Sequence, residues 1–334
     1  MTADQIARAG MLAADKARRR FGIEDSSWID VYGAIETTDT ILMFQPMRNL
    51  GGAYIAEPDA TPGIIVNSNH PLGKQRLSAA HELGHFSLKH KTTLDVDLFG
   101  DGPRPPGHGD DEKLAEQFAL WFLMPHRLLD ASMKAMQIDE VRTPEEVYRL
   151  ALHMGTSYEA TSRHLVNAKR AKRPAMQAAQ KIKPATIKRG LAGDFMPPDA
   201  RNDVHLLNAS ENGTSRIVRP GDRILLTLSE MPTTGYVWHV DSNDALEMIG
   251  DVYLPAHGRA AGADEPDVTG GERQRRIVLA VKDVERPLNR TMLVAKNVRS
   301  WVPDTTLATF KAELAIEPTV RRGAAEQYFV REAA

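Results

Sequence analysis

Two histidines and a glutamate form the clearest chemical signal in the sequence. The segment His81-Glu82-Leu83-Gly84-His85 has the spacing His-Glu-x-x-His. On a helix, positions i and i+4 lie one turn apart on the same face, so both imidazoles can bind one zinc ion. The intervening glutamate, turned partly away, can act as a general base toward water. The alternative is a chance match on an amphipathic helix, with both histidines packed in a core.

A second segment offers a third ligand. Residues 110–125 carry apolar side chains at helical spacing and end at a proline, which predicts a helix. Catalytic zinc takes three protein ligands and keeps one position open, and two histidines with one glutamate are a known set. Glu112 shares the apolar stripe of this helix and can face inward. Glu116, one turn later, is the competing candidate.

Together the two segments resemble the ImmA/IrrE family of zinc metallopeptidases. In that family an HELGH motif precedes a Glu-x-x-Ala-x-x-Phe-Ala stretch that ends in Leu-Met-Pro, and here this stretch runs from Glu112 to Pro125. The resemblance disfavours Glu116, whose position in the family pattern is commonly Asn. It implies one zinc ion per chain, held by a site with Glu82 as catalytic base and His81, His85 and Glu112 as ligands.

Length and composition set the frame for this chemistry. A chain of 334 residues predicts about two domains, and 42% hydrophobic residues suffice for packed cores. A net charge of −2 gives no general attraction to nucleic acid or membrane. Without cysteine, any metal must be bound by histidine and carboxylate, which fits a reducing cytoplasm. No apolar run of membrane-spanning length or signal-peptide character is present, so we expect a cytoplasmic protein without a membrane partner.

The elements around the motif are a helix and short strands. The pattern predicts a helix at 3–21, then strands at 41–44, 53–56 and 63–67. Extended substrates commonly pair with a sheet edge, and 51–54 is the candidate edge, with a plain hairpin turn as the alternative.

The segment between the two predicted site helices is rich in Gly, Pro and Asp. Residues 95–111 therefore predict a loop, which could act as a lid. His90 and His108 could donate to a tetrahedral intermediate, but no spacing rule separates either from an ordinary surface histidine.

Helical and basic segments follow. Residues 143–165 predict two helices around a turn, similar to a helix-turn-helix. The ImmA/IrrE resemblance implies that a similar helical segment closes the peptidase domain, which favours a packing element over DNA binding. The stretch 169–189 gathers lysines and arginines without an acidic residue, and prolines lie nearby. We interpret 169–202 as a basic interdomain linker, with contact to nucleic acid through 169–189 as the minor alternative.

The second half of the chain reads as β-structure. Alternating or apolar runs predict an antiparallel β-sandwich with strands at 203–207, 223–228, 276–281, 291–295 and 307–316. In the last strand, Phe310, Ala312, Leu314 and Ile316 should face inward.

Three loops of this half resemble those of the chagasin family, immunoglobulin-like inhibitors of papain-type cysteine peptidases. The segment from Met231 to Trp238 resembles the family's Asn-Pro-Thr-Thr-Gly-aromatic-x-Trp loop. The chain departs from the family at Met231, which replaces Asn, and at Ser300, which replaces Pro. The strand after the glycine pair also carries arginines where the family often has an aromatic residue. Trp238 could instead fill the sandwich core. The resemblance implies a loop surface made of Thr233, Thr234, Gly235, Gly270, Gly271, Arg299 and Trp301.

The sequence therefore predicts two functional parts. An α+β, zincin-like zinc metallopeptidase domain is expected over 1–168, a linker over 169–202, an all-β immunoglobulin-like sandwich over 203–318 and a tail over 319–334. The first resemblance implies cleavage of a specific protein, such as a DNA-binding repressor or regulator in a bacterial stress or mobile-element response. The alternative is a binding protein whose sandwich inhibits papain-type peptidases or gates its own peptidase domain.

Overall fold

The computed structural model describes residues 1–24, 28–48, 50–96, 109–254, 271–283, 289–299, 301–302 and 305–317. The chain separates into two compact units, mainly between Ile182 and Lys183, and the short segment Ala135–Gln137 groups with the second unit. His108, Gly270 and the tail expected at 319–334 lie outside the described residues.

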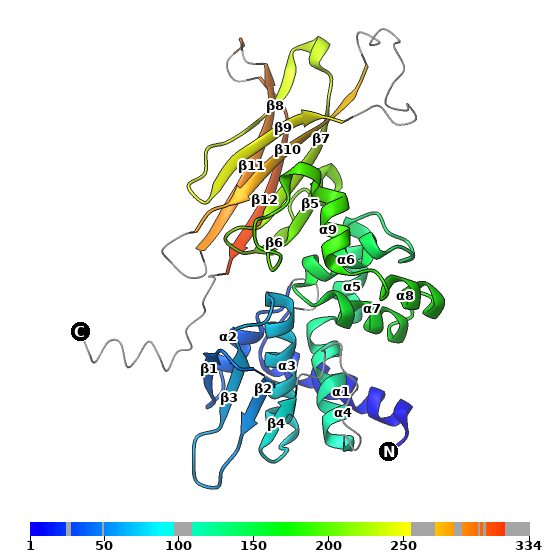
Figure 1. The fold of residues 1–334 in the computed structure, drawn as a ribbon, viewed down its shortest axis with the longest axis vertical. Coiled ribbons are helices and arrows are strands. Elements are labelled where there is room, and N and C mark those ends of the chain that lie inside the picture. The colour runs from blue at the N-terminus through cyan, green and yellow to red at the C-terminus, as the bar shows by residue number, and fades with distance from the viewer. Residues whose placement is uncertain are drawn as a thin grey trace, which may run out of the picture. The chain divides into compact units, whose positions relative to one another are not determined.

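The first unit combines helices with a small sheet (Figure 1). The pair predicted at 143–165 is present: Thr143 caps one helix, Ser157 caps the next, and Gly155 in the left-handed conformation separates them. The helices are α1 (Ala3–Arg20), α2 (Val31–Glu36), α3 (Leu72–Leu88), α4 (Asp110–Leu123), α5 (His126–Ala135), α6 (Pro144–Met154), α7 (Tyr158–Asn167) and α8 (Arg173–Ala179).

The sheet of the first unit has the order β1-β3-β2-β4. Its strands are β1 (Ile41–Gln45), β2 (Leu50–Ile55), β3 (Gly63–Asn67) and β4 (Thr93–Val96). The expectation that 51–54 forms a sheet edge is wrong. After α3 the chain returns as β4 and pairs with β2 antiparallel, so β2 lies between β3 and β4.

Helix α3 packs between this sheet and α4 (Figure 1). Gly84 makes the close approach of the two helices possible, because a Cβ there would lie 3.0 Å from Phe118 Cδ1 and 3.3 Å from the backbone of Ala115. Apolar side chains of both helices are fully buried, among them Leu77, Ala80, Leu83, Phe118 and Phe122. This packing fixes α3 and α4 against each other.

The second unit is a β-sandwich of two four-stranded sheets. One sheet has the order β5-β7-β10-β9 and the other β6-β12-β11-β8, and side chains of both sheets share one apolar core. The expected strand pattern is confirmed at Phe310, Ala312, Leu314 and Ile316, which are all buried. The strands are β5 (Val204–Asn208), β6 (Ser215–Val218), β7 (Arg223–Glu230), β8 (Tyr236–Val240), β9 (Leu246–Tyr253), β10 (Arg273–Val281), β11 (Asn289–Arg299) and β12 (Thr306–Ile316).

The sandwich is mixed rather than wholly antiparallel. Strand β5 pairs with β7 in parallel, and β6 pairs with β12 in parallel. After β5 the chain crosses to the other sheet as β6 and then returns as β7. Because β5 and β7 are not joined by a tight hairpin, they can pair in parallel.

The stretch 169–202, expected as a linker, is folded for much of its length. Helix α8 belongs to the first unit, and α9 (Pro184–Ala192) belongs to the second. Lys188 is buried and its ammonium lies 2.8 Å from Asp203. Among the other cations of the stretch, Arg170 pairs with Asp130, at 2.6 Å.

None of the helices that the structure describes is long and apolar enough to cross a membrane.

Candidate metal centre and candidate binding rim

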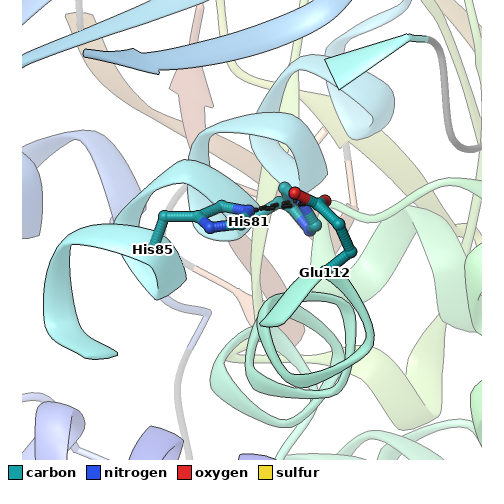
Figure 2. Close-up of side chains that lie close together, drawn as sticks. All are labelled: His81, His85 and Glu112. Atoms are coloured by element: carbon teal, nitrogen blue, oxygen red, sulfur yellow. Dashed lines mark hydrogen bonds and ion pairs between the residues drawn. The ribbon is translucent and has the colours of Figure 1, made fainter. Parts of the chain in front are cut away.

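Helices α3 and α4 bring three donor atoms together (Figure 2). His81 Nε2 lies 3.0 Å from His85 Nε2 and 3.3 Å from Glu112 Oε2, and His85 Nε2 lies 3.5 Å from the same oxygen. Donors bound at about 2.0–2.1 Å around a tetrahedral zinc ion are separated by about 3.3 Å. The three side chains therefore have donor atoms and a spacing that could hold a metal ion.

Burial and charge make this cluster suitable for a cation. Both histidines are buried, whereas the Glu112 side chain is one-fifth exposed, so the cluster is more open on the α4 side. Burial would raise the pKa of Glu112, but hydrogen bonds with His81 and His85 outweigh it and hold that pKa well below its usual range. A charged carboxylate thus faces two imidazole nitrogens.

Glu116, the competing candidate, is not a member of this cluster. It lies one turn further along α4 and lines a separate cavity of about 450 Å³, together with residues of α1, α7 and α8. Of the two acidic candidates, the structure brings Glu112 to the histidines.

Glu82 is fully buried beside the cluster residue His81 on α3. Its carboxylate rests against the backbone of β2, because a Cβ built on Gly52 would lie only 2.5 Å from Glu82 Oε1. The sequence analysis treated Gly51 and Gly52 as an edge or turn. A glycine inside a strand is a recognised sign of close approach, and it could have pointed to this contact.

His90 also lies at the cluster, although no spacing rule marked it. Its Nδ1 is 3.0 Å from Nδ1 of His85, and its Nε2 is 3.6 Å from Asp111 Oδ1. Burial lowers the pKa of His90, which favours a neutral ring with one nitrogen free to accept a proton. The helix ends in a left-handed residue, Lys89, and a lysine at that position gives no warning of such a turn.

In the second unit, two of the predicted loops meet. Trp301 covers Gly235, since a Cβ on that glycine would lie within about 2 Å of the indole ring. Arg299 Nε donates to the carbonyl oxygen of Thr234 at 3.0 Å, and the guanidinium lies 4.5 Å from the ring centre of Tyr236. The loop 231–236, Arg299 and Trp301 therefore form one surface, which we name the rim.

The third predicted loop reaches the same end of the sandwich. Gly271 lies two residues before Arg273, which pairs with Glu230 at the end of β7, where the loop 231–236 begins. Gly271, Thr233 and Thr234 are exposed, and Trp301 is 70% exposed. Trp238, in contrast, is buried in the sandwich core, where its Nε1 donates to the Ser229 carbonyl at 2.8 Å; this confirms the alternative interpretation of that residue.

A buried charge network supports the rim. Glu230 is fully buried and accepts hydrogen bonds from the backbone N–H of Trp238 at 2.9 Å and from Arg275 at 3.3 Å. It also accepts one from the hydroxyl of Tyr253. Arg275 in turn pairs with Asp251. The arginine-rich start of β10 is thus used to hold the strands that carry the rim.

Two family models match the chain, one in each unit. Residues 36–166 match the IrrE N-terminal-like domain, a peptidase family model, and residues 217–315 match the chagasin family peptidase inhibitor I42 model. The N-terminal part is thus similar to the IrrE-like domain and the C-terminal part to the chagasin family, as the two resemblances implied. The first match contains His81, His85 and Glu112, and the second contains all the predicted rim residues.

Solved structures align with about a third of the chain. One is the cysteine protease inhibitor EhICP2 from Entamoeba histolytica, 20% identical, covering 34% of this chain and 96% of its own, with a TM-score of 0.28. A second is amebosin, 23% identical, covering 35% and 98%, with a TM-score of 0.27. A third is PbICP-C in complex with falcipain-2, 12% identical, covering 35% and 92%, with a TM-score of 0.21. No curated protein matches the chain.

Proposed function

We propose that the first unit is a zincin-like, zinc-dependent endopeptidase with His81, His85 and Glu112 as metal ligands and Glu82 as general base. The observation that carries the proposal is the convergence of two Nε2 atoms and one carboxylate oxygen within 3.0–3.5 Å. The match of residues 36–166 to a peptidase family model supports the reaction class.

The proposed reaction is hydrolysis of a peptide bond. When bound, the zinc ion supplies Lewis acidity to water and to the scissile carbonyl. Glu82 takes a proton from the attacking water and passes it to the leaving amine. Its burial against β2 keeps bulk water away from the carboxylate. We further propose a protein substrate, such as a DNA-binding repressor or regulator.

Metal content and cleavage, measured on the same preparations, test this proposal. Wild-type protein should contain close to one zinc ion per chain and should cleave proteins when profiled in the cytosol of its source. Glu82→Gln should keep the metal and lose cleavage, because the residue is a base and not a ligand. A Glu82→Gln variant that cleaves like wild type would contradict the assigned role.

For the second unit we propose a binding function at the rim. The observation in favour is that Trp301, 70% exposed, stands beside Arg299 on a loop surface supported by a buried ion-pair network. Exposed Trp and Arg are typical of residues that dominate interfaces. The partner proposed is the active-site cleft of a papain-type cysteine peptidase, in line with the family matched by 217–315.

Titration of papain-type peptidases with the full chain tests the rim. The double variant Thr233→Ala/Trp301→Ala should weaken inhibition at least tenfold, whereas Met292→Ala should not. Met292 is a matched control because it is also exposed but lies near the start of β11, away from Arg299. Equal inhibition by the double variant and the wild type would remove the rim as the binding surface.

A further inference from the structure

His90 contacts a proposed metal ligand from outside the ligand set. Its Nδ1 lies 3.0 Å from Nδ1 of His85, while Nε2 of His85 faces His81 and Glu112. A histidine that offers Nε2 to a metal keeps its proton on Nδ1, and that N–H needs an acceptor. Within the described residues, the ring of His90 lies where such an acceptor is needed.

The end of α3 places His90 there. Lys89 adopts the left-handed conformation, with φ 59° and ψ 40°, and turns the chain back over the last turn of the helix. The backbone N–H of His90 then donates to the carbonyl oxygen of His85 at 3.0 Å. Its ring packs across that of His85, with centroids 5.0 Å apart and planes at 68°. A left-handed residue other than glycine is unfavourable, and such conformations persist where the surrounding structure holds them.

Helix α4 holds the other side of the His90 ring. Asp111 Oδ1 lies 3.6 Å from Nε2 of His90, and Asp111 directly precedes the proposed ligand Glu112. The first turn of α4 therefore supplies the proposed ligand Glu112 and also Asp111, whose carboxylate faces the ring of His90. That ring in turn contacts the proposed ligand His85. The side chain of His90 is 9% exposed, so water has little access to it.

We propose that His90 is a positioning residue that, together with Asp111, orients His85 toward the metal. In this arrangement Nδ1–H of His85 donates to Nδ1 of His90, and Nε2–H of His90 faces the carboxylate of Asp111. The inference rests on the proposed function of the first unit. It adds two residues that neither touch the metal nor act on the substrate. Partners of this kind typically contribute 10–100-fold to metal affinity.

The test is the zinc affinity of the full chain, measured by competition with a chromophoric chelator at one neutral pH. His90→Ala should bind zinc about 10–100-fold more weakly than wild type. His90→Asn should recover part of the loss, because its side-chain oxygen can accept from His85. Asp111→Asn should cause a smaller loss. Asp110→Asn is the matched control. It removes a negative charge from the same turn of α4, but Asp110 forms its ion pair with the N-terminus.

A second readout separates orientation from general damage. With Co²⁺ in place of zinc, the visible absorption bands report the geometry around the ion, so they should shift in His90→Ala and stay unchanged in Asp110→Asn. The inference is overturned if wild type binds zinc and His90→Ala binds it within twofold, with the same Co²⁺ spectrum. Wild type that binds no zinc would instead overturn the proposed function. If His90→Ala does not fold, equal affinities of Asp111→Asn and Asp110→Asn would overturn the inference, and weaker binding by Asp111→Asn alone would support it.

Discussion

The contact between Gly52 and Glu82 shows how a missing side chain can shape a candidate site. A Cβ at Gly52 would lie 2.5 Å from Glu82 Oε1 and 3.1 Å from the carbonyl oxygen of Ile65. The backbone oxygen cannot move without disturbing the pairing of β2 with β3. Only glycine leaves room for the carboxylate in its present position.

Gly52→Ala should therefore displace Glu82 and lower peptide cleavage about a hundredfold, since a shift of about 1 Å in a catalytic group can cost that much. Zinc content should stay near that of wild type, because no proposed ligand is touched. Gly63→Ala is the control: it lies in the neighbouring strand, and its Cβ would meet nothing closer than 4.0 Å. Equal activity of the two variants would show that the position of Glu82 does not depend on Gly52.

At this scale, sequence spacing was informative for some residues and silent for others. The donors of His81, His85 and Glu112 are related by one helical turn and by the apolar stripe of a second helix, and both relations can be read along the chain. Their role as ligands stays a prediction until a metal is measured. Gly52 and His90 act through contacts that depend on how β2 and the end of α3 fold back, so sequence periodicity could not identify them.

At the scale of the elements, the buried carboxylate of Asp222 lies where β5 pairs with β7. Asp222 accepts hydrogen bonds from Asn202 at 3.0 Å and from the backbone N–H groups of Asp203 and Arg219, each at 2.8 Å. The Oδ2 atom, which accepts the bond from Arg219, also lies 3.1 Å from Nε2 of His205. Burial would raise the pKa of Asp222, but these hydrogen bonds and the charge of His205 lower it overall. Asp222 is thus held as a carboxylate.

A carboxyl group with a lowered pKa stabilises the fold above its ordinary pKa of about 3.9, and this stability is lost as the pH falls toward the folded-state pKa. Asp222→Asn should therefore destabilise the second unit by about 2 kcal/mol at pH 7. The difference from wild type should shrink steadily below about pH 4. Urea unfolding of the full chain across this pH range measures it, with the exposed Asp244→Asn in the same unit as control. A difference that stays constant with pH would contradict the charge-based explanation.

The strands of the second unit differed in how well sequence predicted them. Strand β12 has apolar residues at every second position from Phe310 to Ile316, and this alternation marks a half-buried strand. Strands β6, β8 and β9 were not predicted. Strand β6 has only four residues, and β9 is an edge strand with mostly exposed side chains, so neither shows a clear period of two.

On the scale of the whole molecule, the sequence indicated two units, and the structure divides the chain into two. The prolines that suggested a linker have a different use. Pro174 and Pro184 lie in the first turns of α8 and α9, where a missing N–H and a fixed φ favour helix initiation. Of the basic residues, Arg173, Lys188 and Arg189 belong to these helices, whereas Lys181 and Lys183 lie in the short connection at 180–183.

Limited trypsin digestion should cut the connection between the units at Lys181, which is exposed between α8 and α9. Cleavage after Lys183 is not expected, because proline follows it. The fragment 1–181 should retain its helical content and its zinc. Lys181→Gln should slow this cut while leaving other cuts unchanged. Continued resistance at 181, or loss of zinc from the fragment, would mean that the first unit is not independent.

The ratio of zinc to protein in three preparations tests the central claim most directly. Wild type should contain about one zinc ion per chain, as three converging donors with one open position require. Glu112→Ala should lose most of this zinc, and Glu116→Ala, one turn away on the same helix, should keep it. Wild type without bound metal, or zinc lost in Glu116→Ala but kept in Glu112→Ala, would contradict the metal centre described here.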